Sequence, residues 1–212
     1  MIKNRYPGKF IVLEGLDGAG KSTHTKLAAD FLRESGSDVL LTQEPSFLPA
    51  GDLSRRRLAG DWDCPPESLQ LLFAADRADH LAKEILPALE NGAAVIADRY
   101  FLSSLAYGAV DIEMEMEWLA QINSRFLAPD LTIYLDVPPE VCVQRIAANG
   151  ESAELFERVE ILEIVRQNYQ KAMKMFDGEM KIVSVDGNRN KEEVFGDIIN
   201  KMNVKLKNQN GK

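Results

Sequence analysis

The chain has 212 residues, a length that fits one α/β domain with a substantial core, and its 33 acidic residues outnumber its 25 Lys and Arg residues, giving a formal net charge of −8. This balance argues against a general nucleic-acid-binding surface, which needs clustered positive charge, so any anionic substrate must be met by locally placed cations. No apolar run approaches the ~20 residues that span a bilayer, and the amino terminus leads into a strand rather than a signal peptide, so we expect a cytoplasmic protein with no membrane partner.

Short apolar runs alternate with longer amphipathic segments along the chain. The apolar runs predict buried strands at residues 10–13, 39–42, 93–97, 131–135 and 181–185. Helical spacing predicts helices at 22–34, 67–91, 102–107, 113–126, 139–147, 157–176 and 191–202, the first ended by Gly36 and the second bent or interrupted by Pro87. A flexible loop is expected at 149–153 and a frayed polar tail at 205–212. The alternation predicts a parallel sheet with helices on both faces.

A glycine-rich segment follows the first predicted strand. Residues 15–22, GLDGAGKS, match the phosphate-loop pattern G-x-x-x-x-G-K-[ST], and a helix is predicted directly after them. The glycines let the backbone wrap around phosphate oxygens, Lys21 adds a full positive charge, and Ser22 can ligate magnesium. The alternative is a strand-to-helix turn without chemical function, and the agreement of pattern and context makes it the weaker interpretation. The segment therefore predicts binding of a nucleoside triphosphate.

Two further motifs each contain an arginine that a nucleotide could use. Phe73 and Arg77 are four residues apart, so one helical face presents an aromatic ring beside a guanidinium. Asp98 and Arg99 follow the strand predicted at 93–97, and the carboxyl ends of strands form the ligand crevice in open α/β sheets. There Asp98 could hold magnesium, and Arg99 could bind phosphate oxygens. Taken alone, the first motif could be a core phenylalanine with a solvated arginine, and the second a helix cap with a surface arginine.

Weaker signals come from Ser103, Ser104 and Tyr107, which could line a pocket near a helix start, and from the three successive arginines at 55–57. Successive helical residues diverge by ~100°, so at most one or two of those arginines can face the same ligand.

Cysteine and histidine give no sign of a metal site. Cys64 and Cys142 are isolated, so neither a zinc site nor a disulfide framework is expected. His24 and His80 are expected to be helix-surface or packing residues, without partners that would make either a base or a metal ligand.

Taken in order, these motifs resemble the thymidylate kinase family. The segments that carry the resemblance are FIVLEG with the phosphate loop at 10–22, TQEP at 42–45, FAADR at 73–77, DRY at 98–100, SSLAY at 103–107 and APDLTIYLD at 128–136. The resemblance covers roughly residues 10–169, and several motifs in the right order are more specific than any one of them. It implies an α/β P-loop NTPase fold with a five-stranded parallel sheet, in one domain over residues 1–212, and a short mobile lid at about 147–157. It also implies the reaction of ATP with dTMP to give ADP and dTDP, with Mg²⁺, in dTTP biosynthesis, and a homodimer.

Matched position by position, the resemblance assigns roles to individual residues. The ATP site would comprise Gly15, Leu16, Asp17, Gly18, Ala19, Gly20, Lys21, Ser22 and Thr23, with Arg145 beside adenine. Ser22 and Asp98 would hold magnesium. The dTMP site would comprise Asp17, Arg55, Phe73, Arg77, Arg99, Ser104 and Tyr107, with Phe73 stacked on thymine and Tyr107 against the deoxyribose. Catalysis is expected from Lys21, Asp98, Arg99 and Arg158, by positioning and charge neutralisation.

The chain departs from the family pattern at the catalytic cation. Bacterial-type members with the loop Asp-Gly-Ala-Gly-Lys usually have a lid arginine, often within D-R-x-E, but residues 154–157 read ELFE. The other branch has a basic residue inside the loop, where this chain has Gly18 and Ala19. Arg158 is the nearest candidate substitute, and Lys21, Arg99 and Arg145 could share the task instead. Two alternatives stay open: a kinase for another deoxynucleotide or a nucleoside, such as dUMP, and a catalytically impaired nucleotide-binding regulator.

Overall fold

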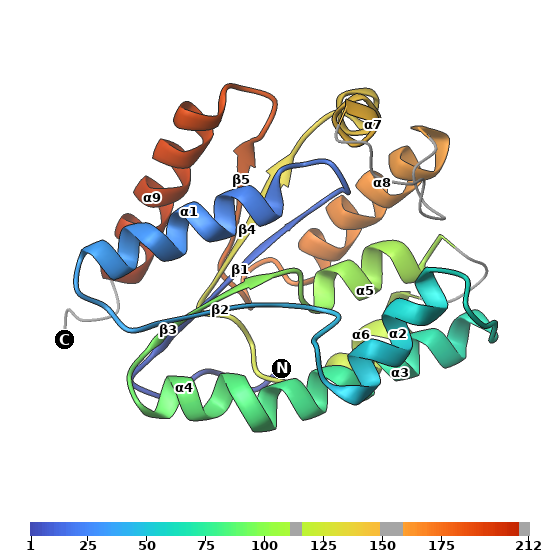
Figure 1. Cartoon of the computed structure of the whole chain (residues 1–212), viewed down its shortest axis with the longest axis horizontal. Coiled ribbons are helices and arrows are strands. Elements are labelled where there is room, and N and C mark those ends of the chain that lie inside the picture. The colour runs from blue at the N-terminus through green and yellow to red at the C-terminus, as the bar shows by residue number, and fades with distance from the viewer. Residues whose placement is uncertain (111–115, 149–158, 208–212) are drawn as a thin grey trace.

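The computed structural model describes residues 1–110, 116–148 and 159–207. At its centre is a five-stranded sheet in the order β2-β3-β1-β4-β5 (Figure 1). The strands are β1 (Lys9–Gly15), β2 (Val39–Gln43), β3 (Ala94–Asp98), β4 (Leu131–Asp136) and β5 (Ile182–Asp186), and every pairing is parallel. The predicted parallel sheet is therefore confirmed, with each strand close to its predicted bounds.

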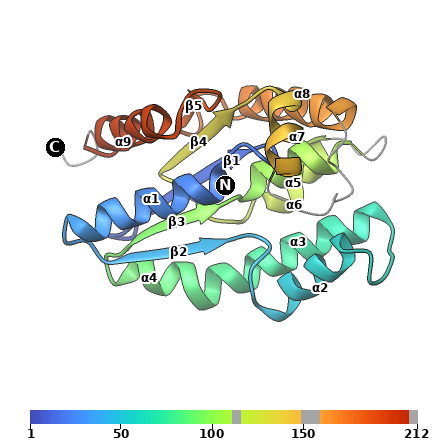
Figure 2. The same ribbon diagram turned by 45° about the horizontal axis from the view of Figure 1, so that its top comes forward.

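Helices cover both faces of the sheet, as predicted. On one face lie α1 (Lys21–Glu34) and α9 (Lys191–Lys207), and on the other lie α4 (Leu86–Glu90), α5 (Phe101–Gly108) and α8 (Val159–Met175) (Figures 1 and 2). The remaining described helices are α2 (Pro49–Leu58), α3 (Pro66–His80), α6 (Met116–Asn123) and α7 (Pro139–Ala148). This is the P-loop NTPase fold.

The winding of the chain places the functional edge of the sheet. From β1 the chain moves outward to β2, returns to β3, and then crosses to β4 on the other side of β1. Ligands bind in open α/β sheets where the winding direction reverses, at the carboxyl ends of the strands. That edge lies at the end of β1, where the glycine-rich segment begins.

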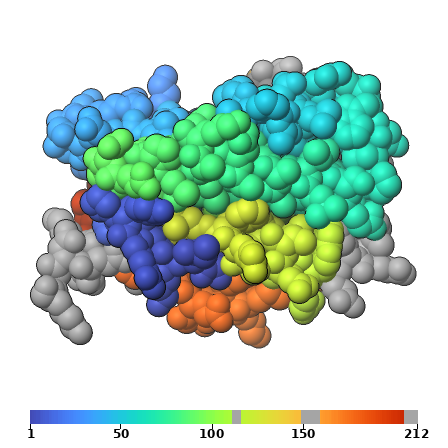
Figure 3. Space-filling model, turned by 90° about the horizontal axis from the view of Figure 1, so that it is seen from below, coloured from blue at the N-terminus to red at the C-terminus, as the bar shows by residue number. Residues whose placement is uncertain are grey.

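The amino-terminal segment closes the opposite edge of the sheet. The Ile2 N–H donates to the Phe126 carbonyl at 3.0 Å, and the Gly8 N–H donates to the Leu89 carbonyl at 2.9 Å. Seen from below, this segment lies beside α4 and the residues that follow α6 (Figure 3). The amino-terminal segment, α4 and the residues after α6 each lead into a strand, so these contacts stabilise the amino ends of the strands. The site lies at the opposite, carboxyl ends.

The helix predicted at 67–91 is interrupted close to Pro87, as expected. After α3 comes η1 (Leu81–Ile85), a π-helical turn in which the Leu86 N–H donates to the Leu81 carbonyl, and then α4. Pro87 has no N–H to offer the Lys83 carbonyl, and its ring crowds the preceding turn, which accounts for the wider turn there.

α2 is a helix that the sequence analysis did not predict. Its residues are mostly polar or small, and it contains Gly51. A Cβ on Gly51 would lie 2.1 Å from the Ser46 carbonyl oxygen, so the glycine allows the helix to pack against this backbone. Pro49 in its first turn supplies a φ suited to a helix start. Tertiary packing against α3 therefore determines this element more than local periodicity does.

The chain ends and loops account for the other differences. The last helix runs to Lys207 rather than to residue 202, so the prediction of a frayed tail was wrong for residues 205–207. These residues are Lys and Leu, which are good helix formers. The predicted loop at 149–153, residues 149–157 of the predicted lid, and the segments 113–115, 157–158 and 208–212 lie outside the described residues.

The core is built from the strands and the helix faces turned toward them, with Phe10, Ile96, Ile133 and Leu162 at most 1% exposed. Among the described residues, no helix combines the length and the apolar character needed to cross a bilayer.

Two apolar truncations on α9 should test how that helix docks. Ile198 is 0% exposed and Val204 is 59% exposed. We expect Ile198→Ala to lower the free energy of unfolding by about 2–5 kcal/mol, because it leaves a cavity in the core. Val204→Ala is the control and should stay within about 0.5 kcal/mol. Urea unfolding measures both, and equal losses would contradict the docking of α9 described above.

Candidate active site

A cavity of about 1060 Å³ opens at the carboxyl edge of the sheet. Its walls come from the glycine-rich loop, the residues after β2, the helices α2, α3, α5 and α7, and the loop after β5. The predicted site residues that line it are Asp17, Gly18, Ala19, Gly20, Lys21, Ser22, Thr23, Arg55, Phe73, Arg77, Asp98, Arg99, Ser104, Tyr107 and Arg145. Gly15 and Leu16, the first two residues of the loop, are buried and do not line the cavity, and Arg158 lies outside the described residues. The structure therefore brings together donor and acceptor residues from distant parts of the sequence.

The glycine-rich loop turns β1 into the N-terminus of α1. Gly18 and Gly20 adopt φ values of +78° and +89°, a region that favours glycine. No side chain caps the first turn of α1, so its N–H groups are available to an anion at the cavity wall. Lys21 donates to the Leu16 carbonyl at 2.7 Å. Burial and the charge of Arg99 lower the pKa of Lys21, against the opposing effect of Asp17, so a bound anion would stabilise its charged form.

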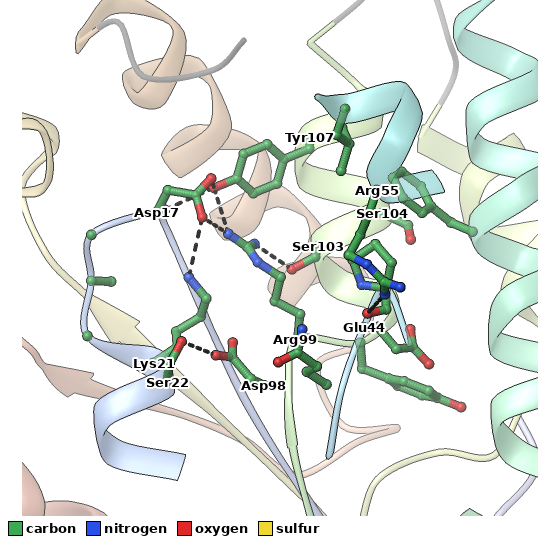
Figure 4. Close-up of a pocket in the computed structure, with 18 of the residues that line it drawn as sticks. Asp17, Lys21, Ser22, Glu44, Arg55, Asp98, Arg99, Ser103, Ser104 and Tyr107 are labelled. Atoms are coloured by element: carbon green, nitrogen blue, oxygen red, sulfur yellow. Dashed lines mark hydrogen bonds and ion pairs between the residues drawn. The ribbon is translucent and has the colours of Figure 1, made fainter. Parts of the chain in front are cut away.

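Ser22 and Asp98 meet across the junction of β1 and β3. The Ser22 hydroxyl donates to Asp98 Oδ2 at 2.5 Å (Figure 4). Asp98 Oδ1 is buried and has no hydrogen-bond partner among the described residues. A hydroxyl and a carboxylate with an unused oxygen suit Mg²⁺, which prefers oxygen ligands. The described part of the chain has no group of three or more Asp, Glu, His or Cys that could hold a metal ion, so phosphates and water would have to complete the coordination.

Arg99 lies at the centre of the cavity wall (Figure 4). It is the one non-glycine residue in the described ranges with a positive φ, +70°, and its N–H donates to the Leu13 carbonyl at 2.9 Å. Its guanidinium pairs with Asp17, donates to the Ser103 hydroxyl at 3.0 Å, and stacks 4.9 Å from the centre of the Tyr107 ring. An unusual backbone conformation that the surroundings hold in place is typical of a functional site.

Asp17 connects the loop to this arginine. Its carboxylate pairs with Arg99, accepts from the Tyr107 hydroxyl at 3.0 Å, and lies 3.8 Å from Lys21 Nζ. Burial on its own would raise the pKa of Asp17, but the charges of Arg99 and Lys21 outweigh it and lower the pKa below its usual value. Asp17 therefore stays ionised and holds two cations at the cavity.

A second arginine, Arg77, forms the opposite wall and is only 2% exposed. Its guanidinium donates to Glu44 Oε2 at 2.6 and 2.8 Å, donates to the Ser104 hydroxyl at 3.2 Å, and bonds the Asn123 side-chain oxygen. It also lies 4.8 Å from the centre of the Tyr100 ring. Phe73, one turn earlier on α3, lines the same wall. Because the Glu44 carboxylate pairs with Arg77, the guanidinium offers N–H donors at the cavity wall rather than an unpaired positive charge.

His80 is a buried packing residue, as expected, but it has polar partners that the sequence did not reveal. It is 0% exposed, and its Nε2 lies 2.7 Å from the Thr42 hydroxyl. Its Nδ1 lies 3.3 Å from Glu44, the carboxylate that holds Arg77. The sequence analysis missed these partners because they come from β2 and the residues that follow it, which sequence spacing does not reveal.

The three arginines at 55–57 divide as their helical spacing predicts. Arg55 lines the cavity, bonds the Ser46 carbonyl, and lies 4.6 Å from the centre of the Phe47 ring. The other two turn away, Arg56 to Asp61 and Arg57 to Asp63. Only Arg55 of the three lines the cavity.

The end of the cavity beyond the glycine-rich loop includes residues that the sequence analysis missed, namely His24, Gly187, Arg189 and Lys191. Arg145 donates to the Gly187 carbonyl at 3.1 Å and so joins α7 to the loop after β5. The rule that singled out Asp98 could have found this loop, because it too follows the carboxyl end of a parallel strand.

Comparison with known proteins identifies relatives over most of the chain. Residues 13–198 match the family model described as Thymidylate kinase. A "Probable thymidylate kinase" of Pyrococcus abyssi is 45% identical over 197 residues, which are 91% of this chain and 94% of that protein. A "Thymidylate kinase" of Nitrosomonas eutropha is 41% identical over 196 residues, 88% of each chain. A "Thymidylate kinase" of Carboxydothermus hydrogenoformans is 35% identical over 197 residues, 90% of this chain and 95% of that protein.

The ionised Asp17 should make stability depend on pH. The pKa of Asp17 is lower in the folded state than its usual value of 3.8. The ionised carboxylate therefore stabilises the fold fully at pH values above 3.8, and this contribution is lost as the pH falls through the lowered pKa. We expect the difference in unfolding free energy between wild type and Asp17→Asn to be largest near neutral pH and to shrink below pH 3.8.

Urea titrations at pH 7 and at roughly pH 3 measure this difference. Asp61→Asn is the control, because Asp61 forms an exposed pair with Arg56 and the substitution should cost less than about 1 kcal/mol at either pH. A difference for Asp17→Asn that does not change with pH would refute the ion-pair role.

Proposed function

Because the chain belongs to the thymidylate kinase family and is a kinase, we propose that it transfers the γ-phosphoryl group of Mg-ATP to dTMP, giving ADP and dTDP for dTTP synthesis. The observation that most supports this is the continuity of one cavity from the glycine-rich loop to the Arg77 wall. Between the two lies Arg99, held by Asp17. A phosphate donor and a phosphate acceptor can meet there without crossing bulk solvent.

On the donor side, the loop amides, the N-terminus of α1 and Lys21 would bind the triphosphate of ATP. Ser22 and Asp98 would hold Mg²⁺, which neutralises phosphate charge when bound. Arg145 would flank adenine next to the loop after β5. This assignment is supported by the burial of Lys21, whose charged form an anion would stabilise.

On the acceptor side, the charge of each arginine supports a division of roles. Arg77 is paired with Glu44 and nearly buried, so its N–H groups suit a neutral carbonyl of the thymine base, with Ser104 beside it. Phe73 would stack on the base. Arg55 is 29% exposed, so it can reach the dTMP phosphate together with Arg99.

The transfer itself needs no covalent enzyme intermediate. An oxygen of the dTMP phosphate attacks the γ-phosphorus, a P–O bond forms, and the bond to the bridging oxygen of ADP breaks in line with it. Lys21 and Arg99 would stabilise the charge on the transferred group. Tyr107, whose hydroxyl bonds Asp17, would pack its ring against the 2′ position of the sugar.

The acceptor can be identified by turnover of dTMP, dUMP, UMP and thymidine with Mg-ATP. We expect dTMP to be the best substrate and UMP to be slower than dUMP, because the Tyr107 ring would meet a 2′-hydroxyl. Thymidine, which lacks the acceptor phosphate, should not turn over. Lys21→Met should lower turnover by roughly 100-fold or more, since it removes a charge aimed at the transferred phosphate.

Lys83→Met makes the same substitution at an exposed surface ion pair and should leave turnover within about twofold. Preference for thymidine over dTMP would indicate a nucleoside kinase. Equal rates on UMP and dTMP would refute the role of Tyr107.

The cation that completes the transition state lies outside the glycine-rich loop, and we propose Arg158 for it. This residue falls outside the described ranges, next to the predicted lid. Arg158→Ala should lower kcat by about 10³-fold if it acts as an arginine finger. Arg33→Ala, at an exposed pair with Asp30 on α1, is the matched control. An Arg158→Ala enzyme within a few-fold of wild type would leave the task to Lys21, Arg99 and Arg145.

A further inference from the structure

Glu14 is a fully buried carboxylate to which the proposed function gives no role. It occupies the next-to-last position of β1, directly before the glycine-rich loop, and is 0% exposed. It accepts from the Tyr100 N–H at 2.9 Å, the Ser103 N–H at 3.3 Å, the Ser103 hydroxyl at 2.6 Å and the Tyr169 hydroxyl at 3.1 Å. No lysine, arginine or histidine in the described ranges forms an ion pair with it.

Its contacts converge on the residues around Arg99. Tyr100 precedes the first residue of α5, and Ser103 lies in the first turn of that helix. Glu14 therefore caps α5 from a neighbouring strand, in place of a side chain from the helix itself. The adjacent Leu13 carbonyl binds the Arg99 N–H, so two successive residues of β1 fix the turn in which Arg99 has positive φ.

The charge of Glu14 also sets the direction of a hydrogen-bond chain. An ionised carboxylate only accepts, so the Ser103 hydroxyl must donate to it. The Ser103 oxygen can then accept from Arg99 Nη1, 3.0 Å away, while its other lone pair faces the Tyr169 hydroxyl, 2.8 Å away. A neutral side chain of the same shape would not impose this direction.

Keeping a charge in this position has a cost. Burial raises the pKa of Glu14, although the hydrogen bond from Ser103 and the charge of Arg99 oppose the shift. The Tyr169 hydroxyl, which also lies 3.3 Å from the Gly15 carbonyl, ties the same carboxylate to α8. A group that only filled space in the core would not need a buried charge.

We propose that Glu14 is a positioning residue for phosphoryl transfer. It holds the Arg99 guanidinium against the cavity through Ser103 and the first turn of α5. The proposal rests on the proposed function in so far as Arg99 contacts the transferred or acceptor phosphate.

The experiment compares wild type, Glu14→Gln, Ser103→Ala and the double variant. Glu14→Gln should lower kcat at least tenfold and leave the KM for Mg-ATP within twofold, because the loop that binds ATP is not altered. Ser103→Ala should lower kcat to a similar extent. The double variant should be no slower than the slower single variant, because both changes break one path to Arg99.

Asp130→Asn is the matched control. The Asp130 carboxylate also accepts from a backbone N–H, that of Phe10 at 2.8 Å, and from a side chain, Asn4, but it lies at the amino edge of the sheet. It should lower the Tm and leave kcat within twofold of wild type, which separates lost positioning from lost stability.

Several outcomes would overturn the proposal: a Glu14→Gln kcat within threefold of wild type, fully additive effects of Glu14→Gln and Ser103→Ala, or an Asp130→Asn loss as large as that of Glu14→Gln. If Glu14→Gln does not fold, a Ser103→Ala kcat within threefold of wild type overturns the proposal on its own.

Wild-type turnover of dTMP tests the proposed function separately. The Glu14 comparison uses the acceptor that the wild type turns over fastest, or ATP hydrolysis if it turns over none.

Discussion

The site depends on the register between β1 and β3. The two strands pair in parallel so that Leu13 lies opposite Asp98, the last residue of β3. This register brings the start of α1 to Asp98, where Ser22 bonds it, and it presents the Leu13 carbonyl to the N–H of Arg99. A slip of one residue would turn every side chain of β1 to the opposite face and would move Glu14 away from α5. Because Glu14 is buried and would lose its hydrogen-bond partners, such a slip would be costly.

The two cavity arginines, Arg77 and Arg99, are paired with carboxylates that differ in their exposure. Arg77 is paired with a buried glutamate, Glu44, and the pair is fixed among Ser104, Asn123 and the Tyr100 ring. Arg99 is paired with Asp17, which is 34% exposed at the cavity. An incoming phosphate can compete for Arg99 far more easily than for Arg77, because the partner of Arg77 is already desolvated. In the proposed function, the same residue type would therefore serve base recognition on one wall and phosphate binding on the other, in a chain whose overall charge is −8.

Features that depend on local sequence patterns could be predicted from the sequence, and features that depend on contacts between distant residues could not. The strands and the glycine-rich loop were predicted because apolar runs and the phosphate-loop spacing are local patterns. The Glu44 contacts to Arg77 and His80 were not, because they join residues more than 30 positions apart. α2 was missed for a related reason, since the close approach of Gly51 to Ser46 is a tertiary contact with no periodic pattern in the sequence. The roles of the site residues were predicted from the resemblance, and the structure adds which of them share the cavity.

The sequence also showed that the glycine-rich loop has no cation beyond Lys21, and the structure gives a physical reason. Gly18 has a φ of +78°, and a Cβ there would lie 2.4 Å from the carbonyl oxygen of Cys142 on α7. That backbone cannot easily retreat, because Cys142 is buried and Arg145, one turn later, is bonded to the Gly187 carbonyl. A basic side chain at position 18 would push α7 away from the loop and take Arg145 with it. The close packing that excludes a basic side chain from position 18 is thus the same packing that holds Arg145 at the cavity, so a cation at position 18 would be gained only by displacing Arg145.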